Sequence, residues 1–317
     1  MGLKIAILGA GNIGGAMLGG ILRSRLAEPE DVVATDAREE RRRELEEQWK
    51  IRTLPTDNRA AARGRDVVIL AVKPFTLPKV LEEIRGVLRP NQIVISVAAG
   101  VPLSFIESIV GNKLSLFRAM PNIPVIVSEG ATAVAGNRST TPEQQAVVGR
   151  IFGALGVVVF VDEPQLDAVT ALSGSGPAYV YMIIEALIEG GKKMGLSQET
   201  ATRLTEQTVL GAAKLVRDTR LHPAVLRDEV ITPGGTTIAA IHELEKHGLR
   251  SMLISAVETA TLRSREIAAQ ILTTFPSSSV TARKPKAAKL SKKKSSPGRA
   301  AARSPKAARP ARKKAGR

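Results

Sequence analysis

The chain offers few side chains for acid–base, nucleophilic or metal chemistry. Its 317 residues include three histidines and no cysteine, so no disulfide, zinc–thiolate site or cysteine nucleophile is expected. His242 and His247 resemble a zinc-protease pair, but a spacing of five puts them on different faces of a helix. Ser175 lies between two glycines with no histidine near it to act as a base. We therefore predict no metal site and expect a bound cofactor to carry the chemistry, as in hydride transfer.

A glycine-rich segment near the N-terminus has the spacing of a dinucleotide-binding loop, G-x-G-x-x-G. It follows a predicted strand and opens a predicted helix, and Asp36 ends the next strand 22 residues after Gly14. In such loops the first glycine makes a tight turn, the second lets backbone approach the pyrophosphate, and the third lets helix and strand pack closely. A glycine-rich turn without a ligand is the alternative. The predicted cofactor-binding residues are Gly9, Ala10, Gly11, Asn12, Ile13 and Gly14.

The acid after the second predicted strand bears on the choice of cofactor. A carboxylate at Asp36 accepts hydrogen bonds from the ribose 2′-hydroxyl of NAD and repels the 2′-phosphate of NADP. Arginines at positions 38, 41, 42 and 43 follow it and could bind a phosphate. Because glutamates are interspersed with them, a solvated face of paired charges is the alternative to a phosphate clamp. We predict that Asp36 and Arg38 contact the cofactor, and both NAD and NADP stay open.

Short apolar runs alternate with helical patterns over residues 1–162, which predicts βαβ units on a mostly parallel sheet. The expected strands are 4–8, 32–35, 66–72, 93–97, 114–118, 131–135 and 157–161. The expected helices are 12–25, 38–49 and 77–88. This pattern is typical of an α/β fold with a Rossmann-like dinucleotide-binding domain.

From residue 163 the strand runs stop, and helical patterns fill the chain to residue 275. The expected helices are 165–171, 177–194, 198–218, 223–230, 236–246 and 250–272. Several, such as 180–188, are apolar on more than one face, which indicates burial against another subunit as well as against a core. We therefore expect residues 163–275 to form an all-helical domain for dimerisation, as a homodimer or a higher homo-oligomer.

The net charge of +16 is concentrated at the C-terminus. Residues 276–317 hold 15 lysines and arginines and no acid, while the rest of the chain holds 31 basic and 30 acidic residues. Like charges and prolines with little apolar area predict a disordered tail. Such a tail binds nucleic acid or other polyanions non-specifically; an inert, solubilising tail is the alternative.

The apolar start of the chain does not have the pattern of a signal peptide. Only Lys4 supplies an early positive charge, and glycines interrupt the run 5–22. No other stretch reaches the roughly 18 uninterrupted apolar residues of a membrane helix. We expect a soluble, cytoplasmic protein with no membrane partner.

Four segments together resemble the pyrroline-5-carboxylate reductases. They are residues 9–14 with Ala71-Val72-Lys73-Pro74, residues 118–122 (Arg-Ala-Met-Pro-Asn), residues 172–179 (Leu-Ser-Gly-Ser-Gly-Pro-Ala-Tyr), and residues 228–237 (Asp-Glu-Val-Ile-Thr-Pro-Gly-Gly-Thr-Thr). The first motifs occur in wider dehydrogenase families, whereas the last two segments are more diagnostic. The resemblance runs in order from residue 1 to about residue 272. It implies NADPH- or NADH-dependent reduction of Δ1-pyrroline-5-carboxylate to L-proline, the last step of proline biosynthesis.

The resemblance also implies roles for individual residues. Those implied on the cofactor side are Ala71, Val72, Lys73, Pro74, Ala98, Ala99, Asn58 and Glu163. Those implied at the substrate are Thr232, Gly234, Gly235, Thr236, Thr237, Ser175 and Gly176. The resemblance thus implies that the helical domain, residues 163–275, also binds the substrate. Thr237 matches the threonine that hydrogen-bonds the substrate's ring nitrogen, so it is the predicted catalytic residue. Two departures stand out: members using NADPH often have a small polar residue and an arginine in place of Asp36 and Ala37, and some members have asparagine in place of Glu229.

The residue types of the substrate segment agree with the resemblance. Gly234 and Gly235 expose successive N–H groups just before a predicted helix, which is typical of a site for a carboxylate. A plain helix-starting turn capped by Thr236 or Thr237 is the alternative. In the expected reaction the imine carbon accepts hydride from the nicotinamide, the substrate carboxylate lies at this helix N-terminus, and Thr237 donates to the ring nitrogen.

Two other interpretations stay open. A β-hydroxyacid dehydrogenase would share the same sheet, but it would need a lysine in the helical domain, and Lys192, Lys193 and Lys214 lack the surrounding motif. A nucleic-acid-binding protein is indicated by the tail alone, because the body has no basic stripe or recognition motif.

Overall fold

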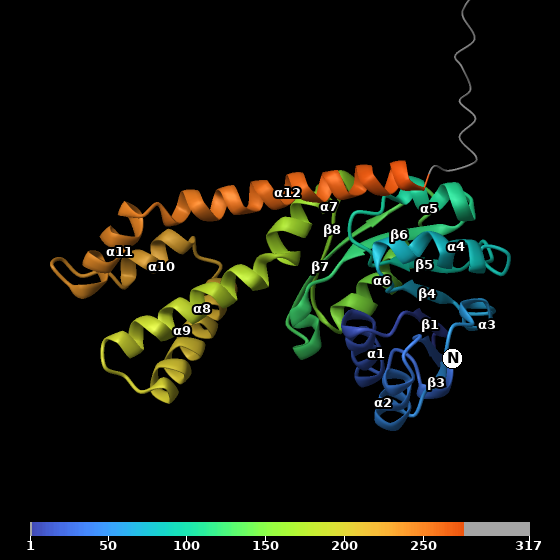
Figure 1. Ribbon diagram of the computed structural model, residues 1–317, viewed down its shortest axis with the longest axis horizontal. Coiled ribbons are helices and arrows are strands. Elements are labelled where there is room, and N and C mark those ends of the chain that lie inside the picture. Colours follow the sequence, from blue (N-terminus) through green and yellow to red (C-terminus); the bar gives the residue numbers. More distant parts are fainter. Residues whose placement is uncertain (1, 276–317) are drawn as a thin grey trace, which may run out of the picture. The chain divides into compact units, whose positions relative to one another are not determined.

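Residues 2–275 are described by the computed structural model, and their first part is built around one eight-stranded sheet (Figure 1). Four neighbouring strands of this sheet are β1 Ile5–Leu8, β2 Val32–Thr35, β4 Val67–Leu70 and β5 Ile93–Ser96. Every residue in these four strands is buried, because the helices of a parallel α/β sheet cover both of its faces. The remaining strands are β3 Arg52–Leu54, β6 Ser115–Met120, β7 Gly130–Gly136 and β8 Gly156–Phe160.

The order of the strands fixes where a ligand can enter. The sheet runs β3-β2-β1-β4-β5-β6-β7-β8, with β2 and β4 pairing in parallel on either side of β1. The chain therefore reverses its direction of travel across the sheet at β1 and β4. In open α/β sheets ligands bind outside the carboxyl ends of the strands at such a switch point. The prediction of a mostly parallel sheet is confirmed, and only β7 runs antiparallel to its neighbour β6.

Helices cover the two faces of the sheet and divide the core into two clusters. The first face carries α1 Asn12–Arg23, α2 Glu39–Trp49 and α6 Pro142–Gly153, which pack on Ile5 and Ile7. The second carries α3 Asn58–Ala62, α4 Leu77–Ile84 and α5 Leu103–Val110, which pack on Ala6 and Leu8. Successive residues of β1 thus point to opposite faces, as the period of a strand requires.

Four elements of this domain were absent from the expectations drawn from the sequence: β3, α3, α5 and α6. β3 has only three residues and begins with the exposed Arg52, so it lacks the apolar run of a buried strand. α3 is five residues long, too short for a visible helical period. α6 starts with a capping box of Thr141 and Gln144 and has Pro142 at its first position, which is a signal for a helix start that the sequence does contain.

The helical part begins at Glu163, three residues after β8 ends, and the division between domains at residue 162 stays a prediction. Its helices are α7 Leu166–Val169, α8 Gly176–Lys193, α9 Gln198–Thr219, α10 Pro223–Glu229, α11 Thr236–Lys246 and α12 Leu249–Thr274. The stretch expected as one helix over 165–171 is instead a short α-helix that passes into a π-helix at Thr170–Gly174.

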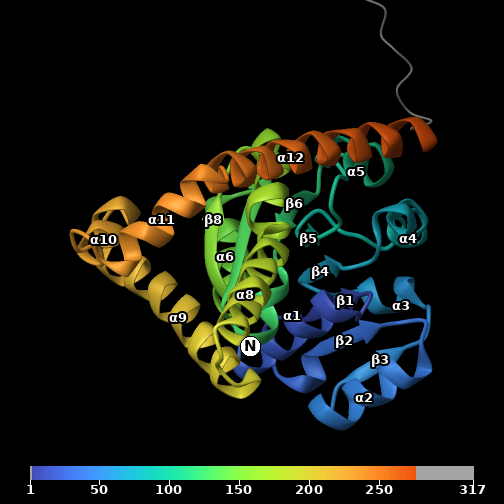
Figure 2. The same ribbon diagram turned by 60° about the vertical axis from the view of Figure 1, so that its left-hand side comes forward.

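α12 returns to the first domain. Figure 2 shows α12 running back across the domain that holds the sheet. Ile271 near its end is fully buried in the second core cluster, and Ile267 packs against Gly100. By contrast, α8, α10 and α11 have no buried residue, and α9 has only Ala201. These helices therefore leave most of their apolar surface uncovered within one chain.

One stretch, Glu163–Lys193, is long and apolar enough to cross a membrane by length and composition alone. It is broken into a 3-10 turn, α7, the π-helix and α8. Only 6% of its most apolar window is buried. Exposure of this kind also marks a surface that a second protein chain covers. The disorder predicted for 276–317 lies outside the residues that the structure describes.

Candidate active site

A cavity of about 640 Å³ lies at the carboxyl ends of β1, β2 and β4, at the switch point of the sheet. Its walls come from the loops that follow these three strands, from the segment between β3 and α3, and from α4. The lining residues are Gly9, Gly11, Asn12, Thr35, Asp36, Ala37, Arg38, Pro55, Thr56, Asn58, Ala71, Val72, Lys73, Thr76, Lys79, Val80 and Glu83. The structure thus brings together most of the predicted cofactor residues from four separate stretches of sequence.

The turn between β1 and α1 cannot accept side chains at two of its glycines. Gly9 has φ +94°, and a Cβ there would lie 2.7 Å from the carbonyl oxygen of Ala71. A Cβ on Gly14 would lie 2.0 Å from the carbonyl oxygen of Gly9. These two glycines therefore let the turn form and let α1 start against the strands, which is what the motif predicts.

Gly11 is different, because it faces the cavity. A Cβ on Gly11 would meet only Nη2 of Arg38, at 3.9 Å, so the space beside it is open. Gly11 is also the N-cap of α1 and has no side chain to satisfy the first N–H groups of that helix. Free N–H groups and the positive end of the helix dipole attract phosphate. The turn is a cradle that fits a pyrophosphate.

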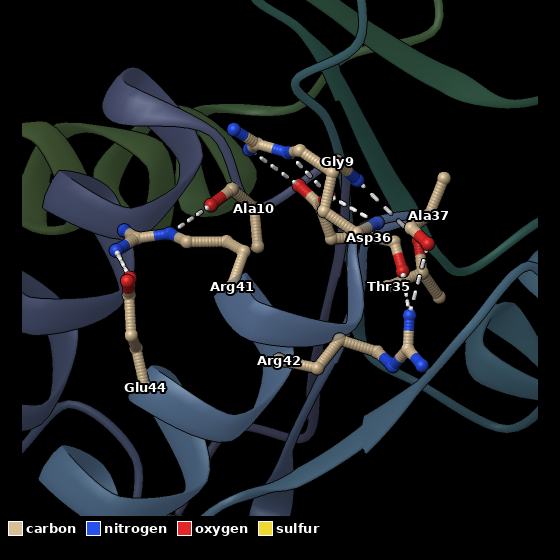
Figure 3. A network of polar contacts seen from close by, with 9 residues as sticks. Gly9, Ala10, Thr35, Asp36, Ala37, Arg41, Arg42 and Glu44 are labelled. Atoms are coloured by element: carbon tan, nitrogen blue, oxygen red, sulfur yellow. Dashed lines mark hydrogen bonds and ion pairs between the residues drawn. The ribbon is translucent and has the colours of Figure 1, made fainter.

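Asp36 stands at the end of β2 in a network of arginines (Figure 3). Nε and Nη2 of Arg38 donate to its two carboxylate oxygens at 3.0 and 3.1 Å, and the Arg38 backbone N–H donates at 3.0 Å. Burial raises the pKa of Asp36, but these bonds from Arg38 outweigh it and hold the pKa below the ordinary value. Asp36 is therefore an ionised group in the wall of the cavity.

The next two arginines of α2 bind backbone carbonyls and do not line the cavity. Nε of Arg41 donates to the carbonyl oxygen of Ala10 at 2.8 Å, and Nη1 of Arg42 donates to those of Asp36 and Ala37 at 2.9 and 3.1 Å (Figure 3). They tie α2 to the glycine turn and to the end of β2. Of the four arginines that could bind a phosphate, only Arg38 lines the cavity.

Asn58 belongs to a hydrogen-bonded chain along the cavity wall. Its amide oxygen accepts from Oγ1 of Thr35 at 2.8 Å, and its amide nitrogen donates to the carboxylate of Glu83 at 2.8 Å. Oγ1 of Thr35 accepts in turn from the N–H of Gly9 at 3.3 Å. Thr35 and Glu83 were not predicted as site residues. Thr35 immediately precedes Asp36, whereas nothing in the sequence around Glu83 distinguishes it from other helix-surface acids.

Several predicted cofactor residues do not line the cavity. Ala10, Ile13 and Gly14 form the turn and the first part of α1, and Pro74 starts the short helix after Lys73. Ala98 is buried after β5, and Ala99 follows it half-buried. None of these lines the cavity itself.

Glu163 belongs to a separate network between the sheet and the helices. Its carboxylate accepts from the N–H of Leu103 at 2.6 Å and from Nη1 of the buried Arg118 at 3.4 Å. Arg118 also pairs with Asp167 at 3.9 Å, and Asp167 accepts from Oγ of Ser264 on α12 at 2.8 Å. Glu163 borders a different hollow beside α5, so its contact with the cofactor stays a prediction.

The predicted substrate loop precedes α11. Gly234 has φ +71°, the N–H of Gly235 donates to the carbonyl oxygen of Thr232 at 3.0 Å, and Gly235 is the N-cap of α11 without a side-chain cap. The alternative of a threonine cap at Thr236 or Thr237 is therefore wrong. Gly234 and Gly235 line a shallow hollow with apolar residues of α11, and no residue of this loop lines the cavity beside Asp36.

Ser175 and Gly176 lie where the π-helix passes into α8. Ser175 is the N-cap of α8 and makes no side-chain capping bond, and Gly174 before it contacts the side chain of Met120. Nδ2 of Asn122 donates to the carbonyl oxygen of Ser173 at 3.0 Å, so the second and third recognised segments touch. Like the loop at Gly234, this segment contributes nothing to the walls of the cavity beside Asp36.

Comparison with protein families gives two matches along the chain. A model described as pyrroline-5-carboxylate reductase dimerisation matches residues 163–267, and one described as NADP oxidoreductase coenzyme F420-dependent matches residues 4–100. A pyrroline-5-carboxylate reductase of Methanosarcina acetivorans is 42% identical over 264 residues, which is 83% of this chain and 97% of that protein. One of Synechocystis is 43% identical, over 84% of this chain and 99% of that protein.

Solved structures of the same family superpose on the chain. The pyrroline-5-carboxylate reductase of Coxiella burnetii has a TM-score of 0.79 at 38% identity, covering 84% of this chain and 99% of that one. The pyrroline carboxylate reductase of Plasmodium falciparum, solved with NADP bound, has a TM-score of 0.76 at 30% identity, covering 84% and 98%. The Rossmann-like sheet followed by a helical domain is therefore shared with both.

Proposed function

The chain belongs to the pyrroline-5-carboxylate reductase family, and on that premise we propose that it reduces Δ1-pyrroline-5-carboxylate to L-proline with NADH or NADPH. The observation that carries this function is the cavity at the switch point, with its glycine cradle and ionised Asp36, in a chain that spans nearly the full length of its relatives. We propose that the protein is a soluble, cytoplasmic enzyme of proline biosynthesis. The membrane-length stretch at Glu163–Lys193 is assigned to dimerisation, because the dimerisation match begins at residue 163.

The residues present fit a nicotinamide dinucleotide. Gly11 leaves open the space that a pyrophosphate needs, and the first N–H groups of α1 point to it. Asp36 would hold the adenosine ribose, and Ala71, Val72 and Lys73 line the side of the cavity assigned to the nicotinamide. When bound, the reduced cofactor supplies a hydride, and the protein supplies position and electrostatics.

The substrate is held by its carboxylate and its ring nitrogen. The backbone N–H groups around Gly235, at the uncapped start of α11, would receive the carboxylate. Thr237, the second residue of that helix, would hydrogen-bond the ring nitrogen and relay a proton from water to it as the imine becomes an amine. Ser175 and Gly176 would complete the substrate pocket. Rate enhancement by positioning alone reaches about 7–11 kcal/mol when the geometry is good.

We propose further that each site takes its substrate loop from the partner subunit. The cavity beside Asp36 is lined only by residues 9–83, and the loop at Gly234 borders a hollow of its own. Helices α8 to α11 bury almost nothing within one chain, yet they carry the loop and match a dimerisation model. A second copy that covers these helices would bring its loop with it.

The reaction is tested by following NADH and NADPH oxidation with Δ1-pyrroline-5-carboxylate. The controls are 2-hydroxy and 3-hydroxy acids, assayed in the oxidative direction with NAD and NADP. Activity on the imine and none on the hydroxy acids is the expected result. Oxidation of hydroxy acids without imine reduction would replace the proposal with a hydroxyacid dehydrogenase.

The shared site is tested by mixing two inactive variants. Gly11→Glu places bulk and negative charge in the cradle, and Thr237→Ala removes the proposed proton donor. If each site combines the two subunits, heterodimers from co-expression of differently tagged chains regain one intact site of two, about a quarter of wild-type activity in a random mixture. If both parts of a site come from one chain, the mixture stays as inactive as the two homodimers.

The basic tail gives a second, independent property. We propose that residues 276–317 bind polyanions, nucleic acid among them, because 15 positive charges stand there without an acid. Such binding falls steeply as salt concentration rises and carries no sequence specificity. The catalytic body does not need it.

A further inference from the structure

α12 joins the helices that carry the substrate loop to the domain that holds the sheet, here called the sheet domain. It begins at Leu249, separated from α11 by His247 and Gly248 alone, and it packs against α7 and the π-helix. Its 26 residues span about 39 Å as one continuous helix. How α12 is fixed to the sheet domain therefore decides how that domain stands relative to α11.

Three residues along one face of α12 meet the sheet domain. Ile271 is fully buried in the second core cluster, and Ile267 packs against Gly100. Ser264 lies one turn earlier on the same face and is only 4% exposed. Apolar contacts are non-directional, whereas a hydrogen bond weakens steeply with distance and angle. Ser264 is therefore the residue of this face that can fix the rotation of α12 most sharply.

The hydroxyl group of Ser264 is bonded to a carboxylate on α7. Its Oγ donates to Oδ1 of Asp167 at 2.8 Å, and that same oxygen lies 3.9 Å from Nη2 of Arg118 on β6. The side chain of Arg118 is 7% exposed and that of Asp167 is 18% exposed. Arg118, Asp167 and Ser264 together form the α12 anchor, which links three elements that are far apart in the sequence.

Two further ion pairs reach the helical part, and both involve exposed side chains. Arg265 lies 4.0 Å from Asp167 with 61% of its side chain exposed. Arg217 on α9 lies 3.4 Å from Glu129, with 54% and 70% exposed. Pairs of this kind contribute little, because water screens the charges and the long side chains lose freedom. The buried polar link between α12 and the sheet domain is thus the α12 anchor.

The α12 anchor also lies at the start of the second stretch that leads to the substrate. Asp167 is in α7, which passes directly into the π-helix Thr170–Gly174, and Ser175 follows as the N-cap of α8. π-Helical turns recur at functional sites. The segment that ends at Ser175 and the helix that leads back to the substrate loop are therefore held at one point.

We propose that Arg118, Asp167 and Ser264 are positioning residues, which orient the sheet domain and its bound cofactor toward the helices that hold the substrate. The proposal rests on the proposed function. A rotation of about 5° at Ser264 would move the start of α12, roughly 22 Å away, by about 2 Å. A misplacement of about 1 Å is enough to slow a reaction by about 10²-fold. None of the three residues lines the cavity beside Asp36, so cofactor binding itself should not depend on them.

In a site shared by two subunits, the α12 anchor acts in the chain that binds the cofactor. The helical parts of the two chains pack on each other, so this interface holds the loop that the partner subunit supplies. The sheet domain, in contrast, is oriented toward that interface by its own α12 anchor. Loss of the anchor should therefore slow the site to which the chain gives its cavity, and spare the site to which it gives its loop.

The first experiment compares two serine-to-alanine variants of α12 in steady-state kinetics. Ser264→Ala should lower kcat about tenfold or more and raise the isotope effect with NADH deuterated at C4, because hydride transfer becomes slower. Its Kd for NADH should stay within about twofold of wild type and its Tm should fall by about 2–4 °C. Ser264→Thr keeps the hydroxyl group and should restore most of kcat. Ser251→Ala is the matched control, since the Ser251 hydroxyl donates to the carbonyl of Gly248 beside the start of the same helix; it should behave as wild type.

The second experiment places the change in one chain of a heterodimer. Purified heterodimers of Gly11→Glu and Thr237→Ala chains have one intact site, with its cavity from the Thr237→Ala chain and its loop from the other. Ser264→Ala added to the Thr237→Ala chain should lower their activity about tenfold, and added to the Gly11→Glu chain should leave it unchanged.

Each other outcome has a definite meaning. An unchanged kcat and isotope effect in the Ser264→Ala homodimer would overturn the proposal. Equal losses from both placements in the heterodimer would also overturn it, because they indicate a general loss of structure. If the heterodimers are inactive before Ser264 is changed, the shared site fails instead, and the homodimer kinetics decide the role of the α12 anchor. If wild type does not reduce the imine, the proposed function itself is wrong.

Discussion

Gly11 and Gly14 belong to one motif, yet the structure predicts that alanine at the two positions fails for different reasons. A Cβ on Gly11 meets only Arg38, at 3.9 Å, whereas a Cβ on Gly14 would overlap the carbonyl oxygen of Gly9 at 2.0 Å. Gly11→Ala should therefore fold normally and bind the cofactor poorly. Gly14→Ala should strain the turn itself.

The magnitudes follow from these contacts. A substitution into open space changes stability by less than about 0.5 kcal/mol, so Gly11→Ala should shift Tm by no more than about 2 °C. Its methyl group stands where the pyrophosphate must approach, and overpacking there costs about 1–3 kcal/mol, or roughly a 5- to 150-fold rise in Kd. For Gly14→Ala the same penalty falls on the protein alone and should lower Tm by about 2–12 °C.

The assay combines thermal melting without cofactor and calorimetric Kd for NADH and NADPH. Cofactor should raise Tm of wild type through mass action and raise that of Gly11→Ala much less. Equal losses of Tm in the two variants would refute the division of roles between the glycines. So would tight cofactor binding by Gly11→Ala, because the cradle would then not be the pyrophosphate site.

Four further predictions concern other parts of the chain. Thr237→Ala should lower kcat by about 10²-fold or more with cofactor Kd unchanged, and Thr237→Ser should restore much of it; an unaltered kcat would remove Thr237 from the chemistry. Glu163→Gln weakens the bonds to Leu103 and Arg118 and should lower Tm by about 2–4 °C, whereas a raised cofactor Kd at unchanged Tm would place Glu163 in the cofactor site. Hydrogen bonds from Arg38 outweigh burial and lower the pKa of Asp36 from its ordinary value of 3.8, so the carboxyl group loses its charge only as pH falls through that lowered pKa. NADH affinity should therefore be flat from about pH 5 to 8. A rise in Kd within that window would contradict the pairing of Asp36 with Arg38. Truncation after residue 275 should leave kcat and KM unchanged and abolish retention on heparin at moderate salt, whereas loss of catalysis would make the tail part of the enzyme.

Local patterns were enough to predict the architecture. Runs such as 32–35 and 93–96 are apolar and bounded by turn residues, so their burial in a parallel sheet could be read from residue types alone. The start of α11 at Thr236 follows from the two glycines before it. Where the pattern is short or interrupted, as in β3 and α3, the same reasoning finds nothing, because three to five residues do not display a period.

The cofactor motif was also visible in sequence, because its glycines answer to steric demands within a single turn. Gly9 must take a positive φ, and Gly14 must lie against the carbonyl of Gly9. Both requirements arise within the same short segment of the chain. The place of Asp36 beside the glycine turn could be predicted as well, since it follows the strand that pairs with β1. These assignments needed no knowledge of distant packing.

The partners of those residues were decided only by the tertiary structure. Whether the arginines after Asp36 form a phosphate clamp could not be read from their spacing, because it depends on which carbonyls α2 meets when it packs on the glycine turn. Thr35, Asn58 and Glu83 are joined from three elements by contacts that no local pattern encodes. The contacts of Glu163 with Leu103 and Arg118 likewise join distant segments that no local pattern connects. Motifs follow from local steric and electrostatic needs, whereas the pairing of charges depends on how distant segments pack together.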